Sequence, residues 1–207
     1  MAVRSKQPAD RATAKAARPP VKERLLSVAT RLFARHGFES TSVQDIVDAA
    51  GVTKGAMYHY YDSKDDLLYE VYHRLLSMQT AHLDEIAAGP GTPEERLRAA
   101  AADVVQSSLD NLDDLIVFFR SLHMLPEDKQ AQVRAERRRY QDKFRALVED
   151  GVAAGTYRSD ISSDIVVHYF LSVVNQLGSW YKPDGTLSPA QVGDLFTELL
   201  IGGLAVR

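Results

Sequence analysis

Apolar side chains recur every three or four residues through most of the chain, which is the spacing of helices with one buried face. The first such segment spans residues 21–36 and ends at Gly37. No alternating strand pattern stands out, so the sequence predicts an all-α fold. Beyond residue 93 the same spacing predicts further helices at about 94–109, 112–125, 127–154, 161–181 and 189–204.

Residues 41–64 contain two short predicted helices joined by a tight corner. Thr41 or Ser42 can cap the first helix, and Asp45 follows Ser42 at the spacing of a capping box. Gly51 ends this helix, where a left-handed residue costs least. Two helices joined by about four residues that include glycine form a helix-turn-helix, whose second helix enters the major groove of DNA.

The second short helix is expected at residues 54–60, with Thr53 as its cap. It has too few apolar residues to be buried on all sides, and its hydroxyls, imidazole and ammonium are groups that bond phosphates and base edges. An ordinary surface turn with a few aromatic side chains is the alternative. The candidate DNA-binding residues are Thr41, Ser42, Thr53, Lys54, Gly55, Ala56, Tyr58, His59, Tyr60 and Lys64.

A long helix is expected to follow, because Ser63 can cap it and aspartates occupy its first turn. Its apolar stripe begins at Leu67 and continues to Ala87. A helix of about 25 residues spans nearly 40 Å, so its tilt could carry a signal between a head and a body. Lys64 lies at the head end, where it is either a phosphate contact or a plain surface lysine.

Charge is distributed unevenly along the chain. The whole sequence carries a formal charge of −3, but residues 1–64 hold 11 Lys and Arg against 6 Asp and Glu, and the remainder holds 14 against 22. Residues 1–20 read as a flexible basic arm that either contacts DNA or is a solvated tail without a role. A basic end on an acidic body suits a DNA-binding head on a regulatory body, and uneven sampling of a mixed surface is the alternative.

Composition excludes several classes of protein. There is no cysteine, no apolar run of about 18 residues and no secretory signal, so we expect a cytoplasmic protein without a membrane partner. Walker, Rossmann, HExxH and GxSxG signatures are absent, and the six histidines are scattered. The sequence therefore predicts no enzyme, no catalytic residues, no metal site and no cofactor.

The second half places aromatic and polar residues within apolar helices, as the wall of a ligand pocket requires. Core packing is the alternative for each aromatic residue, and a solvated helix face is the alternative for the arginines near residue 138. Buried amides need partners, which favours a ligand role for the two neighbouring amides. The candidate effector-binding residues are Phe118, Phe119, His123, Arg138, Tyr140, Tyr169, Asn175 and Gln176.

The last two predicted helices each carry a broad apolar face, more than a body of this size easily buries. Two copies facing each other across a two-fold axis would bury these faces as a four-helix bundle. The candidate interface residues are Val166, Phe170, Val173, Leu195, Phe196 and Leu199.

Residues 21–70 resemble the DNA-binding domain of the TetR family of transcriptional regulators. The resemblance is carried by ATRLFARHGFESTSV and by QDIVDAAGVTKGAMYHYYDSKDDLL. It implies a homodimer, formed by the last two helices, that binds a palindromic double-stranded operator. The segment SWYKPDGTLSPAQVGDLFTELLIGGL further resembles regulators of fatty-acid and sterol catabolism, whose ligands are acyl-CoA thioesters.

Together these observations predict a basic arm at residues 1–20, a helix-turn-helix domain at 21–66 and a helical effector-binding and dimerisation domain at 67–207. The predicted function is that of a ligand-responsive regulator, a repressor rather than an activator, released from DNA by a small effector. A small all-helical enzyme and a helical interaction protein without DNA binding are the alternatives.

Overall fold

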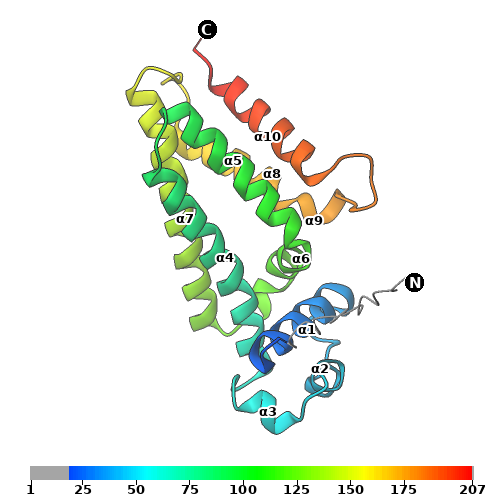
Figure 1. Ribbon diagram of the computed structural model, residues 1–207. Coiled ribbons are helices and arrows are strands. Elements are labelled where there is room, and N and C mark those ends of the chain that lie inside the picture. The colour runs from blue at the N-terminus through cyan, green and yellow to red at the C-terminus, as the bar shows by residue number, and fades with distance from the viewer. Residues whose placement is uncertain (1–18, 207) are drawn as a thin grey trace, which may run out of the picture.

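The computed structural model describes residues 19–206, and its regular secondary structure there is helical, apart from one antiparallel bridge between Tyr157 and Ala205. The all-α prediction is therefore confirmed. The first three helices form a head at one end, and the later helices form a body that the long helix α4 joins to the head (Figure 1). Most of the predicted basic arm lies outside the described residues. Within 19–206, no helix is both long and apolar enough to cross a membrane.

The head follows the boundaries that its local signals predict. Its elements are α1 (Val21–His36), α2 (Val43–Ala50), α3 (Lys54–Tyr58) and the start of α4 (Lys64–Ala88). The Ser42 hydroxyl accepts from the Asp45 N–H, and the Asp45 carboxylate accepts from the Ser42 N–H at 2.8 Å. Gly51 closes α2 at a left-handed φ of 62°. The predicted second helix extended to Tyr60, but α3 ends earlier, at Tyr58.

The body contains α5 (Pro93–Asp110), α6 (Leu112–Ser121), η1 (Leu122–Met124), α7 (Glu127–Ala153), α8 (Ser163–Asn175), α9 (Leu177–Trp180) and α10 (Pro189–Leu204). Two predicted helices are interrupted. In the one at 112–125 the α-helix ends at Ser121 and a 3₁₀ turn follows, after which Pro126 holds Leu125 extended. The one at 161–181 breaks at Gln176 so that α9 packs on α6, where a Cβ on Gly178 would lie 2.9 Å from Ile116 Cγ1.

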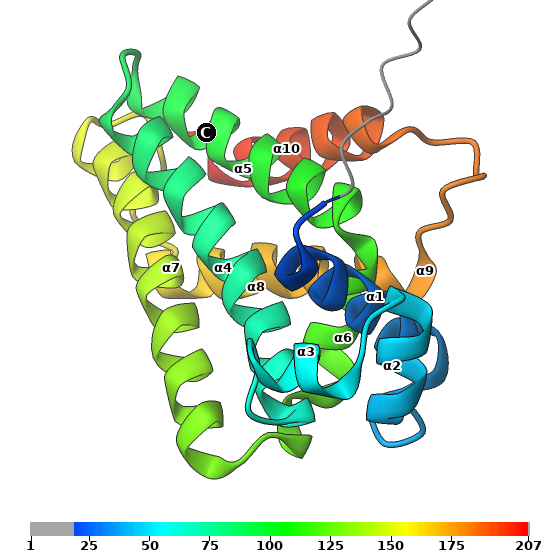
Figure 2. The same cartoon turned by 60° about the horizontal axis from the view of Figure 1, so that its bottom comes forward.

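Two hydrophobic clusters fill the described part of the chain, and α4 contributes to both. Its first turns, from Leu67 to Leu76, pack with the head, whereas Leu83 packs with the body. The head cluster also takes Phe118 from α6 and Val133 from α7. Figure 2 shows α4 passing between the head and the body, with α1 against α6. The hydrophobic core of the head thus continues past the predicted domain boundary between residues 66 and 67 and into the first turns of α4.

A partly buried ion pair, with Asp114 buried and Arg74 partly exposed, lies where the head, α4 and α6 meet. Arg74 Nε of α4 donates to the Asp114 carboxylate of α6 at 3.1 Å, and Arg74 Nη2 donates both to that carboxylate and, at 3.1 Å, to the Thr30 hydroxyl of α1. Burial raises the pKa of the Asp114 carboxyl, although the hydrogen bonds from Arg74 oppose that shift. One guanidinium therefore ties three helices together.

We expect Asp114→Ala to lower the free energy of unfolding by about 1.5–3 kcal/mol, because it removes charged hydrogen bonds and leaves Arg74 without its acid. The control is Asp113→Ala, which removes an exposed carboxylate from the same turn and should change stability little. Urea denaturation measures both variants. Equal effects of the two substitutions would contradict the role given to Asp114.

Candidate functional site

The surface of α3 is the first candidate site, at the end of the head remote from the body (Figure 1). Met57 holds α3 on the head core, while Tyr58 and Tyr60 are 50% and 43% exposed. The His59 ring lies edge-on to the Tyr60 ring, with 4.8 Å between the centroids. The structure thus brings a histidine and two tyrosines together on one exposed surface.

The start of α3 adds polar groups to this surface. The Thr53 hydroxyl accepts from the Ala56 N–H at 3.1 Å and caps the helix. Lys54 is exposed and pairs with no acid in the part of the chain that the structure describes. A Cβ on Gly55 would meet only the Thr53 hydroxyl oxygen, at 3.8 Å, so the packing of the protein itself does not require glycine there. Because Gly55 has no side chain, another molecule has room to approach the backbone of α3 there.

One of the predicted DNA contacts needs correction. The Thr41 side chain is only 2% exposed, and its hydroxyl donates to the Gly37 carbonyl at 2.8 Å, so it faces the core and not DNA. The cap of α2 is Ser42, whose hydroxyl is exposed and bonded to Asp45, so its predicted DNA contact stays a prediction.

Lys64 is not a plain surface lysine. Its Nζ donates to the carbonyls of Phe38 and Thr41, at 2.8 and 2.9 Å, and lies 4.3 Å from the centroid of the Phe38 ring. An ammonium has three N–H groups, so two are occupied by the loop that leads into α2. Its predicted phosphate contact stays a prediction, and its observed role is to fix this loop.

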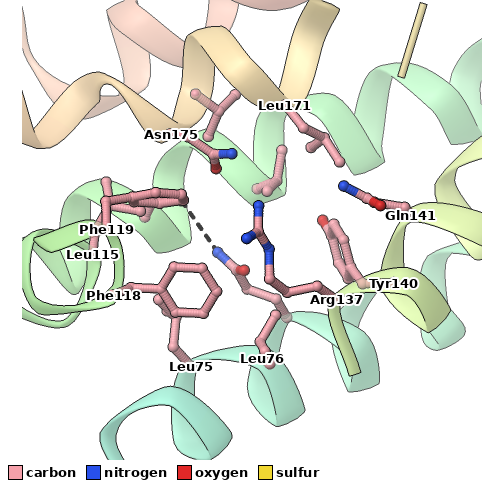
Figure 3. A pocket seen from close by; sticks show the side chains of 14 residues that line it. Leu75, Leu76, Leu115, Phe118, Phe119, Arg137, Tyr140, Gln141, Leu171 and Asn175 are labelled. Atoms are coloured by element: carbon pink, nitrogen blue, oxygen red, sulfur yellow. Dashed lines mark hydrogen bonds between the residues drawn. The ribbon is translucent and has the colours of Figure 1, made fainter. Parts of the chain in front are cut away.

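A small cavity of about 40 Å³ lies between α4, α5, α6, α7 and α8 (Figure 3). The structure brings four of the predicted effector residues together here, namely Phe118, Phe119, Tyr140 and Asn175. The other lining residues are Leu75, Leu76, Gln79, Val104, Ser108, Leu115, Arg137, Gln141, Leu171 and Val174.

Gln79 is a lining residue that the sequence analysis missed. Its Nε2 donates to the hydroxyls of Ser107 and Ser108, both at 3.1 Å, and the three side chains are buried. Gln79 follows Leu75 and Leu76 at helical spacing, on the apolar stripe of α4. A polar residue on a buried stripe was the signal that could have identified it.

Arg137 is the arginine of the cavity, in place of the predicted Arg138. Its guanidinium lies in the middle of the lining side chains in Figure 3, 5.3 Å from the Phe118 ring centroid and 5.7 Å from that of Phe119. Burial lowers the pKa of this guanidinium, and no carboxylate in residues 19–206 pairs with it. Arg138 is exposed, one residue and about 100° further round α7.

The remaining predicted effector residues lie outside the cavity. His123 is exposed beyond α6, and Tyr169 is 62% exposed on α8. Gln176 lines a separate surface groove of about 260 Å³ with Arg120. This groove shares Leu115, Phe119 and Asn175 with the cavity, so the two spaces adjoin.

Two rows of apolar side chains are exposed on the body, one on α8 and one on α10. The α8 row is Ile165, Tyr169 and Val173, and the α10 row is Leu195 and Leu199. The predicted interface residues Val166 and Phe170 are buried within the protomer, where the Phe170 ring stacks on Phe144 at 5.5 Å, so their assignment is corrected. Phe196 is half-buried, 6.3 Å from Trp180 between ring centroids.

Comparison with known proteins agrees with this arrangement. Residues 25–71 match the family described as bacterial regulatory proteins, tetR family, and residues 90–204 match the tetracyclin repressor-like C-terminal domain. The chain belongs to the tetR family. Membership makes it a DNA-binding transcriptional regulator and not an enzyme.

Three individual proteins are similar to this chain over most of its length. The HTH-type transcriptional repressor KstR2 of Mycolicibacterium smegmatis is 27% identical over 184 residues, which cover 88% of this chain and 90% of that protein. The crystal structure of PfmR from Thermus thermophilus superposes with a TM-score of 0.81 at 28% identity, over 88% of this chain and all of that one. AibR, crystallised with isovaleryl coenzyme A and operator DNA, shares the fold with a TM-score of 0.78 at 24% identity, over 88% of this chain and 98% of that one.

We expect Lys64→Ala to lower the free energy of unfolding by about 1.5–3 kcal/mol, because two charged hydrogen bonds to the loop are lost. Lys54→Ala is the matched control, since its exposed side chain has no acid partner among the described residues, and it should stay within about 0.5 kcal/mol of wild type. Chemical denaturation of the two variants compares them. A Lys64 variant as stable as the Lys54 variant would rule out the loop-fixing role.

Proposed function

We propose that this tetR-family member is a cytoplasmic, ligand-responsive transcriptional repressor that binds a palindromic operator as a homodimer. A small effector in the body cavity releases it from DNA. The observation that carries the proposal is α3, which buries Met57 and exposes Lys54, Tyr58, His59 and Tyr60. The name of the KstR2 relative supports repression over activation.

Recognition of DNA follows from the chemistry of α3. Lys54 supplies a free ammonium for a phosphate, and the tyrosine hydroxyls and the imidazole supply groups for phosphates or base edges. Gly55 lets the helix backbone approach the groove because nothing in the head occupies the space beside it. Thr53 and Ala56 complete the proposed contact surface, while Ser42 and Lys64 lie at its border.

Dimerisation accounts for the two exposed apolar rows. Contiguous apolar surface of this kind marks an interaction site in a soluble protein. A two-fold axis lets the same rows on two copies cover each other and sets two recognition helices at a fixed distance. We therefore place the interface on Ile165, Tyr169, Val173, Leu195 and Leu199, with Phe196 at its edge.

Effector binding can reach the head through α6. This helix presents Phe118 and Phe119 to the cavity and Asp114, one turn earlier, to Arg74 and so to α1. A displacement of α6 would disturb the contacts that position α1 and α4. An effector drives this change only if it binds the two arrangements with different affinity.

The proposed effector is an amphiphilic molecule of the acyl-CoA type. A cavity of about 40 Å³ holds little more than a water molecule, whereas ligand pockets usually measure about 300–1,000 Å³. Binding therefore requires the cavity to open, and the adjoining groove of about 260 Å³ offers space for a further part of such a ligand. The coenzyme A ester bound by AibR is consistent with this class in a protein of the same fold.

The direct test is a gel shift with DNA from upstream of the gene. Wild-type protein should bind it, and Lys54→Ala should bind more weakly on every sequence. The slope of log affinity against log salt should fall by about one for each recognition helix engaged, as expected for a lost phosphate contact. Failure of the wild type to retard any such fragment would overturn operator binding at that locus, and an unchanged slope would remove Lys54 from the interface.

The dimer is tested by Leu199→Glu. Leu199 is 69% exposed, so a glutamate costs the protomer little, but across an apolar interface it would bury an unpaired charge at several kcal/mol. Sedimentation should show a monomer with normal helix content. Leu199→Ala is the control and should remain dimeric. A dimeric glutamate variant would move the interface away from α10.

A further inference from the structure

Arg137 carries a positive charge in surroundings that, within the described part of the chain, supply no opposite charge. Its side chain is half-buried, and its guanidinium lies among cavity walls that are mostly apolar. Taking a charge out of water is costly unless an opposite charge and hydrogen bonds replace the water. Within residues 19–206 its side chain makes no ion pair and no hydrogen bond, and its guanidinium carbon lies over two phenylalanine rings.

The two ring contacts offset only part of this cost. A cation above an aromatic face gains about 0.5–2 kcal/mol, depending on how dry the site is. The planar guanidinium also carries five N–H donors, which rings satisfy poorly and which an oxyanion satisfies in pairs. No nitrogen of Arg137 is among the fully buried polar atoms without a partner, so an oxyanion arriving from solvent can reach the guanidinium, and no carboxylate within residues 19–206 occupies that place.

The neighbours of Arg137 suggest how such an anion would arrive. Phe119, Gln141 and Asn175 are partly exposed lining residues, whereas Leu115, Phe118 and Tyr140 are buried, so the cavity opens toward α6, α7 and α8. In Figure 3 the Asn175 amide faces the guanidinium across the cavity. The groove outside, lined by Arg120, is joined to the cavity through Phe119 and Asn175.

We propose that Arg137 is the anion anchor of the effector site, so that the effector is an apolar molecule whose oxyanion pairs with this guanidinium inside the cavity. A carboxylate and a coenzyme A phosphate share this chemistry. Pairing draws the guanidinium away from the two phenylalanine rings, and the apolar part of the ligand takes the space that it leaves. The proposal uses the proposed function only in taking this cavity as the effector site.

Calorimetric titration of the full-length protein, without DNA, tests the anchor. The probes are decanoate, decanoyl-CoA and methyl decanoate. At least one of the two anions should bind, and the neutral ester should bind at least tenfold more weakly, because it leaves Arg137 unpaired. Binding of decanoate alone identifies a carboxylate as the recognised group, and binding of decanoyl-CoA alone identifies the coenzyme phosphates.

Variants separate Arg137 from its neighbours. Arg137→Met should weaken the bound anion at least tenfold, and Arg137→Lys, which keeps the charge but not the planar fork, should lose less. Arg138→Met is the matched control and should bind like wild type, because Arg138 is exposed and does not line the cavity. Circular dichroism and operator binding show whether each variant folds.

Several results would overturn the anchor: no binding of either anion, equal binding of the neutral ester, or a folded Arg137→Met variant that binds anions like wild type. Each of these leaves operator recognition intact. If an anion binds through Arg137 but fails to release the operator complex in a gel shift, the anchor stands and ligand-controlled release fails. The two proposals are thus tested separately.

Discussion

The partly buried pair between Arg74 and Asp114 is the contact on which the arrangement of head and body depends. A carboxylate at that depth is stable as an ion only with a partner, so Arg74 must stay within hydrogen-bond distance of α6. The same guanidinium donates to Thr30, whose hydroxyl in turn donates to the Leu26 carbonyl of α1. The position of α1 is therefore set from the body by electrostatics as well as by packing.

The shared helix α4 links the body cavity and the head through one element. Arg74 faces the junction, while the next two residues, Leu75 and Leu76, face the cavity. Further along, Gln79 is pinned by two serine hydroxyls of α5. Any widening of the cavity must push on side chains adjacent to the junction, because packed interiors transmit displacement and do not absorb it. Coupling between the sites needs no long chain of contacts here.

The parts of the structure that the sequence predicted well are those that local chemistry determines. The capping box at Ser42, the left-handed Gly51 and the Thr53 cap each act within a few residues, so helix starts and ends in the head could be predicted. The errors arose between adjacent residues, as with Arg137 and Arg138. Consecutive residues on a helix differ by about 100° in direction, and only the packing of distant helices decides which one faces inward. The same ambiguity led the sequence analysis to assign Val166 and Phe170 to the interface, although both are buried. Their neighbours Ile165 and Tyr169 are exposed and belong to the interface that we propose.

The proposed anchor, a charged side chain in the body cavity, has a consequence for selectivity. If an apolar side chain stood in the place of Arg137, any apolar molecule of sufficient size could displace it, because one hydrophobic contact would replace another. Displacing Arg137 with a neutral molecule instead strips the guanidinium of its ring contacts and supplies no counter-charge, so the penalty remains. Only a ligand with an anion in reach relieves it. If Arg137 anchors the effector as proposed, the cavity discriminates against neutral lipophilic compounds before any detail of ligand shape is considered.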